Sequence, residues 1–278
     1  MSSRAPGFSL VEVLIVALLA TVIMGAVYET LTVQQRSARQ IGVITGTQQT
    51  VRTAVQYLQS ELREIGARPG DIRGATTTRI TFRALRKVAF ACTDAGATVD
   101  VYTYGDRLVA GDTLDIYADG GTSSMADDQI VRAVVSSVAP TNACPAVTGS
   151  PWTSMSQNTQ RLGLTAIDPI VGIKAGAAIR SFRTVTYGIY SQGGTYVLGR
   201  QESPPDTVVA LIGPLARNGL EFAYWKMDNT AIAPTNLAGS LDAIARIRIT
   251  VRGRTPGAAT PGGTYSDSLV TDVFLRGN

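Results

Sequence analysis

One carboxylate in this sequence lies within a long apolar run, where burial of a charge costs free energy. Glu12 lies inside the run Phe8–Val27, whose 20 residues contain no other charged side chain. A carboxylate within a membrane segment costs about 2.5–3.5 kcal/mol on insertion scales, so such a residue usually has a function and a charged partner. We therefore expect Glu12 to pair with a buried cation. The alternative is that Glu12 lies near the membrane edge and faces lipid headgroups.

Other groups that could catalyse a reaction or bind a metal are scarce. The 278-residue chain contains no histidine and only two cysteines. This composition excludes Ser-His-Asp and Cys-His catalysis and leaves too few ligands for a zinc site built from Cys and His. No glycine-rich phosphate-binding loop occurs. We predict no enzymatic activity, no cofactor and no metal, and a membrane-anchored enzyme is the weakest alternative.

The two cysteines, Cys92 and Cys144, lie 52 positions apart in loop-like surroundings. In an exported chain, two cysteines commonly form one disulfide. A bridge over this length would stabilise the fold by about 4 kcal/mol in the loop-entropy model. We predict a disulfide, with two free buried thiols as the alternative.

A set of arginines alternates with apolar residues near the C-terminus: Arg246, Arg248, Arg252 and Arg254. Alternation around Ile247, Ile249 and Val251 predicts a half-buried antiparallel strand. The arginine face is either an anion-binding stripe, for DNA phosphates or acidic polysaccharide, or a solvated face paired with acids such as Asp272. We favour the second interpretation, because no aromatic residue interleaves with the arginines and a net charge of +4 is weak evidence for nucleic-acid binding.

Two further groups have ordinary structural explanations. Five aspartates are close in sequence: Asp112, Asp115, Asp119, Asp127 and Asp128. Oxygen ligands suit calcium, but their spacing is not that of an EF-hand, so solvated turns are favoured. The aromatic residues Tyr187, Tyr190, Tyr224 and Trp225 are predicted to lie in the core or on a sheet face.

The first element expected to position these residues is a long helix. As a helix, Phe8–Val27 spans about 30 Å, the thickness of the hydrocarbon core of a bilayer. A secretory signal peptide fits less well, because its apolar region is shorter and a small-residue cleavage site follows it. Apolar residues then recur in steps of three and four from Ile41 to Ile65, which predicts a helix that ends at Gly66. A coiled coil is the rival interpretation, but we expect this face to pack on the chain's own sheet.

After Gly70 the pattern changes to short β-like runs separated by turn residues. Strands are predicted at Thr78–Leu85, Thr98–Tyr104, Thr113–Tyr117, Gln129–Val135, Ile179–Tyr190, Thr195–Gln201, Thr207–Leu211, Leu220–Lys226, Ala243–Val251 and Ser268–Arg276, with a loop over 139–160. The fold class is therefore α+β, with a long N-terminal helix packed on an antiparallel β-sheet head. The domain boundaries we predict are a leader at 1–7, a membrane helix at 8–28, an amphipathic helix at 29–66 and a β-rich head at 67–278.

The run Gly7-Phe8-Ser-Leu-Val-Glu12 resembles the prepilin peptidase site of type IV pilins and type II secretion pseudopilins. The resemblance covers a short basic leader, a glycine, a phenylalanine, an acid five residues after the glycine and a long apolar run. It implies cleavage between Gly7 and Phe8 by a prepilin peptidase and methylation of the new Phe8 amino group. It also implies a subunit that waits in the inner membrane with its head outside the cytoplasm. An inner-membrane assembly platform then builds it into a filament with other pilins.

Buried together in such a filament, Glu12 and a neighbouring Phe8 amine would offset each other's cost and fix the register between subunits. Looser likenesses to large PilW-type minor pilins and J-type pseudopilins lie at Val51–Gly66, Gly219–Trp225, Ile247–Val251 and Val273–Asn278. We therefore expect a minor pilin or pseudopilin that acts in filament initiation or at a tip, in pilus biogenesis, DNA uptake or type II secretion. The alternative is a tip adhesin or DNA-binding receptor that uses the arginine stripe.

Overall fold

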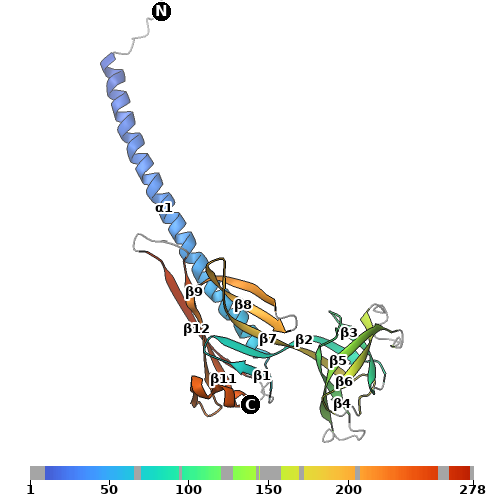
Figure 1. The fold of residues 1–278 in the computed structure, drawn as a ribbon. Coiled ribbons are helices and arrows are strands. Elements are labelled where there is room, and N and C mark those ends of the chain that lie inside the picture. The colour runs from blue at the N-terminus through green and yellow to red at the C-terminus, as the bar shows by residue number, and fades with distance from the viewer. Residues whose placement is uncertain are drawn as a thin grey trace, which may run out of the picture.

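The computed structural model describes residues 10–65, 70–93, 96–119, 128–141, 144, 158–168, 172–203, 207–255 and 263–275. Its elements, in chain order, are α1 (Leu10–Arg63), β1 (Ile72–Ala75), β2 (Arg79–Ala91), β3 (Thr98–Tyr104), β4 (Thr113–Ala118), β5 (Gln129–Pro140), β6 (Thr159–Ala166), β7 (Ala178–Gln192), β8 (Thr195–Ser203), β9 (Thr207–Trp225), β10 (Ala231–Ile232), the 3-10 helices η3 (Pro234–Gly239) and η4 (Leu241–Ala243), β11 (Arg246–Arg254) and β12 (Ser266–Phe274). A long helix packs against a large antiparallel sheet (Figure 1), which confirms the predicted α+β class.

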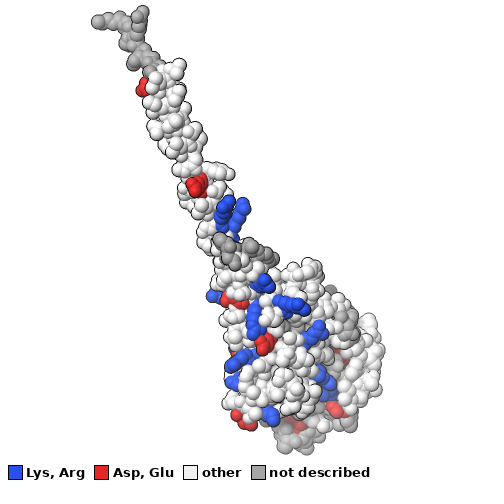
Figure 2. Space-filling view, turned by 60° about the vertical axis from the view of Figure 1, so that its left-hand side comes forward, with Lys and Arg blue, Asp and Glu red and all other residues white. Residues whose placement is uncertain are grey.

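The helix α1 is continuous over 54 residues, a length of about 80 Å. Its N-terminal part projects from the head (Figure 1), and Figure 2 shows that the surface of this part is almost free of charge. The buried residues of α1 are Thr47, Val51, Ala54, Val55, Leu58 and Leu62. The predicted apolar face therefore packs only over its C-terminal part, and Ile41 is 62% exposed because the helix has already left the sheet. A last turn follows α1, in which the Ile65 N–H donates to the Leu62 carbonyl.

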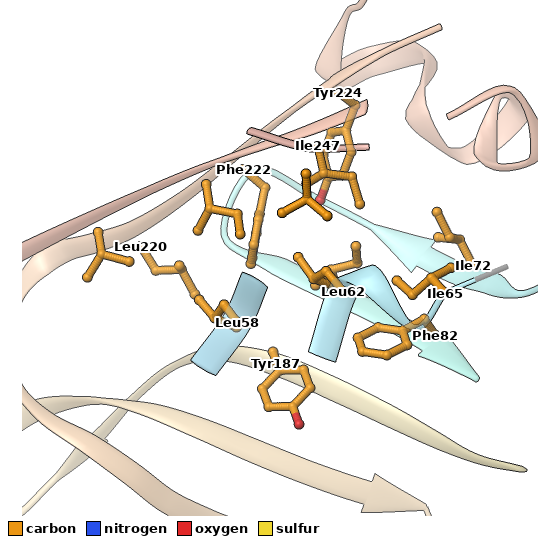
Figure 3. Packing of buried hydrophobic residues seen from close by; sticks show 14 of the residues in the cluster. Leu58, Leu62, Ile65, Ile72, Phe82, Tyr187, Leu220, Phe222, Tyr224 and Ile247 are labelled. Atoms are coloured by element: carbon orange, nitrogen blue, oxygen red, sulfur yellow. The ribbon is translucent and has the colours of Figure 1, made fainter. Parts of the chain in front are cut away.

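The C-terminal part of α1 is enclosed by a curved sheet, and we call this unit the helix lobe. Its strands are hydrogen-bonded in the order β1-β2-β7-β8-β9-β11-β12 through the additional β2–β7 pairing. Figure 3 shows Leu58 and Leu62 between Tyr187 on β7 and Phe222 on β9, so the sheet contributes side chains on two sides of the helix. Its buried side chains include four aromatic rings, from Phe82, Tyr187, Phe222 and Tyr224.

A glycine lets the helix approach β11 closely. A Cβ atom at Gly253 would lie 2.6 Å from Cγ2 of Val51 and 2.9 Å from Cγ2 of Thr47. Those distances are too short for ordinary contacts, so a side chain at this position would push α1 away from the sheet. The absent side chain thus sets where the helix crosses β11.

A second unit, which we call the barrel lobe, is built on the far ends of two strands that it shares with the helix lobe. Beyond the helix lobe, β2 pairs with β3 through Val88–Ala91, and β7 pairs with β4 through Ile179–Phe182. The strands β3, β6, β5 and β4 pair in that order, so the circuit β2-β3-β6-β5-β4-β7 closes on itself through the β2–β7 pairing. Figure 1 shows this lobe lying away from α1.

Several strands differ from their predicted bounds because they serve two lobes or are longer than one apolar run. The strand β6 was not predicted, since its sequence Thr-Gln-Arg-Leu-Gly-Leu-Thr-Ala has few β-branched residues. The strand β9 is one strand where two were predicted, because Gly213 and Pro214 interrupt the apolar pattern without ending the strand. Of the loop predicted over 139–160, the first residues belong to β5 and the last to β6, and most of the residues between them lie outside the described part of the chain.

Candidate functional site

The projecting part of α1 places Glu12 on an apolar cylinder. Glu12 lies in the first turn of the helix and is exposed. Among the described residues, α1 is the one helix long and apolar enough to cross a membrane, with a mean hydropathy of 2.7 over its most apolar window and no burial there. Gly7 and Phe8, the predicted cleavage and methylation residues, lie outside the described residues. Within the described part of the apolar run, residues 10–27, Glu12 is the only charged side chain, and it is exposed.

The predicted arginine stripe lies on the face of β9, β11 and β12 that points away from α1, which we call the outer face. Burial alternates along β11, with Ile247, Ile249 and Val251 inside. Arg248 donates from Nε and Nη2 to the two Asp272 carboxylate oxygens at 2.8 and 3.0 Å, and these hydrogen bonds lower the pKa of Asp272. Arg252 donates from Nη2 to Glu221 at 2.6 Å. Two of the four arginines are thus joined to acids on neighbouring strands.

Aromatic rings interleave with these arginines, contrary to the expectation from the linear sequence. Arg246 is flanked in register by Trp225 on β9 and Phe274 on β12. The guanidinium carbon of Arg246 lies 4.5 Å from the Trp225 ring centroid and 5.9 Å from the Phe274 centroid. The guanidinium carbon of Arg248 lies 4.9 Å from the Trp225 centroid. The rings come from neighbouring strands, so they could have been located only by aligning the predicted strands 220–226 and 268–276 on 243–251.

Comparison with known proteins bears on the N-terminus. Residues 2–28 match the family described as the prokaryotic N-terminal methylation motif. The chain has a type IV pilin-like N-terminus. No curated protein and no solved structure matches the chain. The matched residues include Gly7, Phe8 and Glu12.

In this pilin-like chain, the two lobes of the head meet at a layer of ion pairs, which we call the seam. At its centre is Asp112, whose side chain is fully buried. Its carboxylate accepts hydrogen bonds from Lys87 Nζ at 3.0 Å, Arg183 Nε at 2.9 Å and the Val109 N–H at 3.0 Å. Burial opposes ionisation of Asp112, but these hydrogen bonds outweigh it and lower the pKa of the carboxyl group. Asp112 is therefore held as an anion.

A buried cation also joins strands of both lobes. Arg83 on β2 is 3% exposed and contacts Asp71 at 3.3 Å and Asp115 at 2.8 Å. Arg132 on β5 contacts the same Asp115 oxygen at 3.2 Å. Because Asp115 belongs to the barrel and Asp71 precedes β1, Arg83 ties the barrel lobe to the helix lobe.

The seam continues to the helix. Glu202 on β8 lies 3.7 Å from both Arg86 and Arg183, and Arg86 lies 3.6 Å from Glu61 on α1. The Tyr187 hydroxyl donates to the same Glu61 oxygen at 2.7 Å, and burial raises the pKa of Tyr187 well above its usual range. A continuous chain of polar contacts therefore runs from α1 to the barrel strands.

These contacts correct the interpretation of the aspartate cluster as solvated turns. Asp112 and Asp115 are buried among cations, and Asp128 accepts a hydrogen bond from the Tyr117 hydroxyl. Asp127 lies outside the described residues. In the described part of the chain, no group of three potential metal ligands occurs.

The predicted disulfide is present in the barrel lobe. Cys92 and Cys144 are bonded, with their Cα atoms 4.9 Å apart. Cys92 directly follows β2, and Cys144 follows β5. The bridge therefore joins the ends of two barrel strands that are not neighbours in the sheet.

Proposed function

We propose that this chain is a minor pilin or pseudopilin, a structural subunit rather than an enzyme. It acts in the initiation or at the tip of a type IV pilus-like filament, in pilus biogenesis, DNA uptake or type II secretion. The observation that carries the proposal is the N-terminal methylation motif on a helix whose first half is apolar and unpacked. An apolar helix that contacts nothing in its own head needs a membrane or other helices around it.

Glu12 is the residue that we assign to subunit registration. After cleavage by a prepilin peptidase, the methylated Phe8 amine of one subunit and Glu12 of a neighbour would lie in the same apolar bundle. Each charge alone would be costly to bury, and the pair offsets that cost. The mature subunit would be held in the inner membrane and then transferred by the assembly platform to the filament.

The shape of the head supports a minor rather than a repeating subunit. The barrel lobe extends the head sideways from the helix axis (Figure 1), and the seam gives it a defined attachment. In a helical array, every subunit must leave room for its neighbours around the axis. A head with a lateral second lobe is easier to place at an end of the filament than in every turn of the shaft.

The experiment compares Glu12→Ala with Glu29→Ala in the native cell. Both variants delete one exposed acid from the same helix, and only Glu12 lies in the motif. N-terminal sequencing and intact mass should show both chains beginning at methylated Phe8. Glu12→Ala should be missing from sheared filaments, whereas Glu29→Ala should be present at the native level. Quantitative mass spectrometry should find the native chain at a small fraction of the main subunit.

Three results would overturn the proposal. A native chain that still begins at Met1, or one cut after the apolar run, would remove the pilin-like processing. Normal incorporation of Glu12→Ala would remove the registration role. A copy number equal to that of the main subunit would make the chain a shaft component.

A further inference from the structure

The outer face presents side chains whose binding capacity is not used within the chain. It carries the four arginines 246, 248, 252 and 254 opposite two carboxylates, those of Glu221 and Asp272. Within the described residues, Arg246 and Arg254 form no direct ion pair with a carboxylate, although the charge of Arg246 helps to lower the pKa of Asp272. The outer face therefore carries more basic than acidic side chains.

The same face exposes apolar and aromatic surface. Phe274 is 66% exposed and Val270 is 54% exposed on β12, and both lie on the arginine side of the sheet. Figure 2 shows the head from the side on which β9, β11 and β12 lie in Figure 1, and there basic side chains gather with few acidic ones between them. A ligand for this face must therefore offer both negative charge and flat surfaces that stack on a ring.

The direction of the face follows from the packing of α1. The inner side of β11 contacts α1, so the arginines point away from the helix. If the chain assembles as proposed above, the helices form the filament core and the outer face points away from that core. This step rests on the proposed function, and it makes the face accessible to a ligand from outside the filament.

Single-stranded nucleic acid has the chemistry that this face would recognise. Proteins bind such strands without sequence preference by combining basic side chains for phosphates with aromatic side chains for bases. Arginine guanidinium planes can also stack on bases. A duplex hides its base faces, and an acidic polysaccharide has charge without flat aromatic rings. The combination of the exposed Phe274 ring with Arg246, which forms no direct ion pair, therefore favours a single strand over either one.

We propose that the outer face of β9, β11 and β12 is a binding platform for single-stranded nucleic acid. Phe274 stacks on a base, Arg246 contacts a phosphate or a base plane, and Trp225 holds Arg246 flat against the sheet. With two to four phosphates neutralised, the slope of log K against log salt should lie between about −1.4 and −2.8.

The test measures fluorescence anisotropy of a labelled oligothymidine of about 12 nucleotides with the mature chain in neutral detergent. Phe274→Ala should weaken binding by about 5- to 150-fold, the range expected for one lost stacked base. Phe274→Trp keeps an aromatic ring at this position and should bind the oligonucleotide as the native chain does. Arg246→Ala should weaken binding and reduce the magnitude of the salt slope by about 0.7.

Matched controls come from the barrel lobe. Tyr104 is 63% exposed, close to the value for Phe274, so Tyr104→Ala removes an equally exposed ring elsewhere. Arg180 is exposed on β7, so Arg180→Ala removes an exposed cation outside the outer face. Both variants should bind the oligonucleotide as the native chain does.

The proposal is overturned if Phe274→Ala and Tyr104→Ala have equal effects, or if duplex DNA or a sulfated polysaccharide binds equally well and is insensitive to Phe274→Ala. It is also overturned if the chain binds no oligonucleotide at low salt. Loss of Phe274→Ala from filaments in that case would show that the outer face is a subunit contact. The binding assay needs no filament. Normal incorporation of Glu12→Ala would thus remove the proposed registration role without changing the anisotropy result.

Discussion

The two lobes of the head bury their apolar side chains in different ways. The helix lobe has an open sheet, and it buries one face by enclosing the end of α1 among bulky aromatic and branched side chains. Among the described residues the barrel lobe has no helix, and its sheet closes on itself around aliphatic side chains. Its buried cluster contains five alanines and, among the described residues, no aromatic ring.

This difference shows how a second unit can be attached to a head that is built around a helix. Two long strands, β2 and β7, run through both lobes, so their backbone hydrogen bonds continue across the boundary. Charged side chains, among them Arg83, Lys87 and Asp112, lie between the two hydrophobic clusters. The seam therefore connects two cores that could each remain packed without the other, and variants should separate them.

The largest effect is expected from Asp112→Ala. This change leaves Lys87 and Arg183 facing a buried gap, and removal of one partner from a buried pair typically costs about 3–5 kcal/mol. Hydrogen exchange should rise on β4 and on the halves of β2 and β7 next to the seam. Protection of α1 and β11 should change little. Equal loss of protection in both lobes would show that the head unfolds as one unit.

The converse change is Leu62→Ala in the helix lobe. Leu62 is fully buried between the two sides of the curved sheet, and a cavity of this kind costs about 2–5 kcal/mol. Exchange should rise in α1, β9 and β11, whereas β3 to β6 should keep their protection. Leu31→Ala is the matched control, because Leu31 is half-exposed on the projecting helix and should leave the stability of the head unchanged.

Removal of the disulfide should weaken the barrel lobe alone. A Cys92→Ser, Cys144→Ser chain is expected to lose about 2–4 kcal/mol, since the bridge limits the unfolded chain over a separation of 52 residues. Limited proteolysis should then cut between β3 and β6 at lower denaturant concentrations than in the native chain. Earlier cleavage within β11 or β12 instead would contradict the independence of the lobes.

Acid should also weaken the barrel lobe. Hydrogen bonds from Arg161 lower the pKa of Asp100, and the seam lowers that of Asp112. A lowered folded-state pKa means that the stabilisation is complete above the unfolded value of about 3.9 and is lost as the pH falls through the folded value. Cleavage by pepsin should therefore increase in the barrel lobe as the pH falls below about 4. An Asp100→Asn chain should show a weaker pH dependence, and an unchanged profile would contradict this assignment.

The sequence predicts the helix lobe better than the barrel lobe, for physical reasons. The period of α1 and the alternation on β11 are local patterns, and each is imposed by one buried face. Closure of the barrel depends on which strands meet, and that information is not local. In β6, a buried Gln160 and the central Gly163 weaken the apolar alternation of Leu162 and Leu164, so β6 was missed.

The candidate sites also differ in how far the local sequence predicts them. Glu12 and the cysteine pair are visible as single residues against their surroundings, whereas the outer face is assembled from three strands. Arg246, Trp225 and Phe274 are separated in the chain by at least 20 positions and become neighbours only through register. The seam was hidden for the same reason, because Asp112 and Asp115 have the sequence context of exposed turns.

The smallest effect on stability is expected from Asp272→Asn, an ion-pair change on the outer face rather than in the seam. The side chains of Arg248 and Asp272 are 42% and 28% exposed, and exposed pairs contribute about 0–1 kcal/mol. The melting temperature should therefore change little, in contrast to Asp112→Ala. Because the change frees Arg248, oligonucleotide binding should become tighter and the magnitude of its salt slope should increase by about 0.7. A large loss of stability would mean that exposed and buried pairs are equivalent in this head, and weaker oligonucleotide binding would mean that Asp272 holds Arg248 in its binding position.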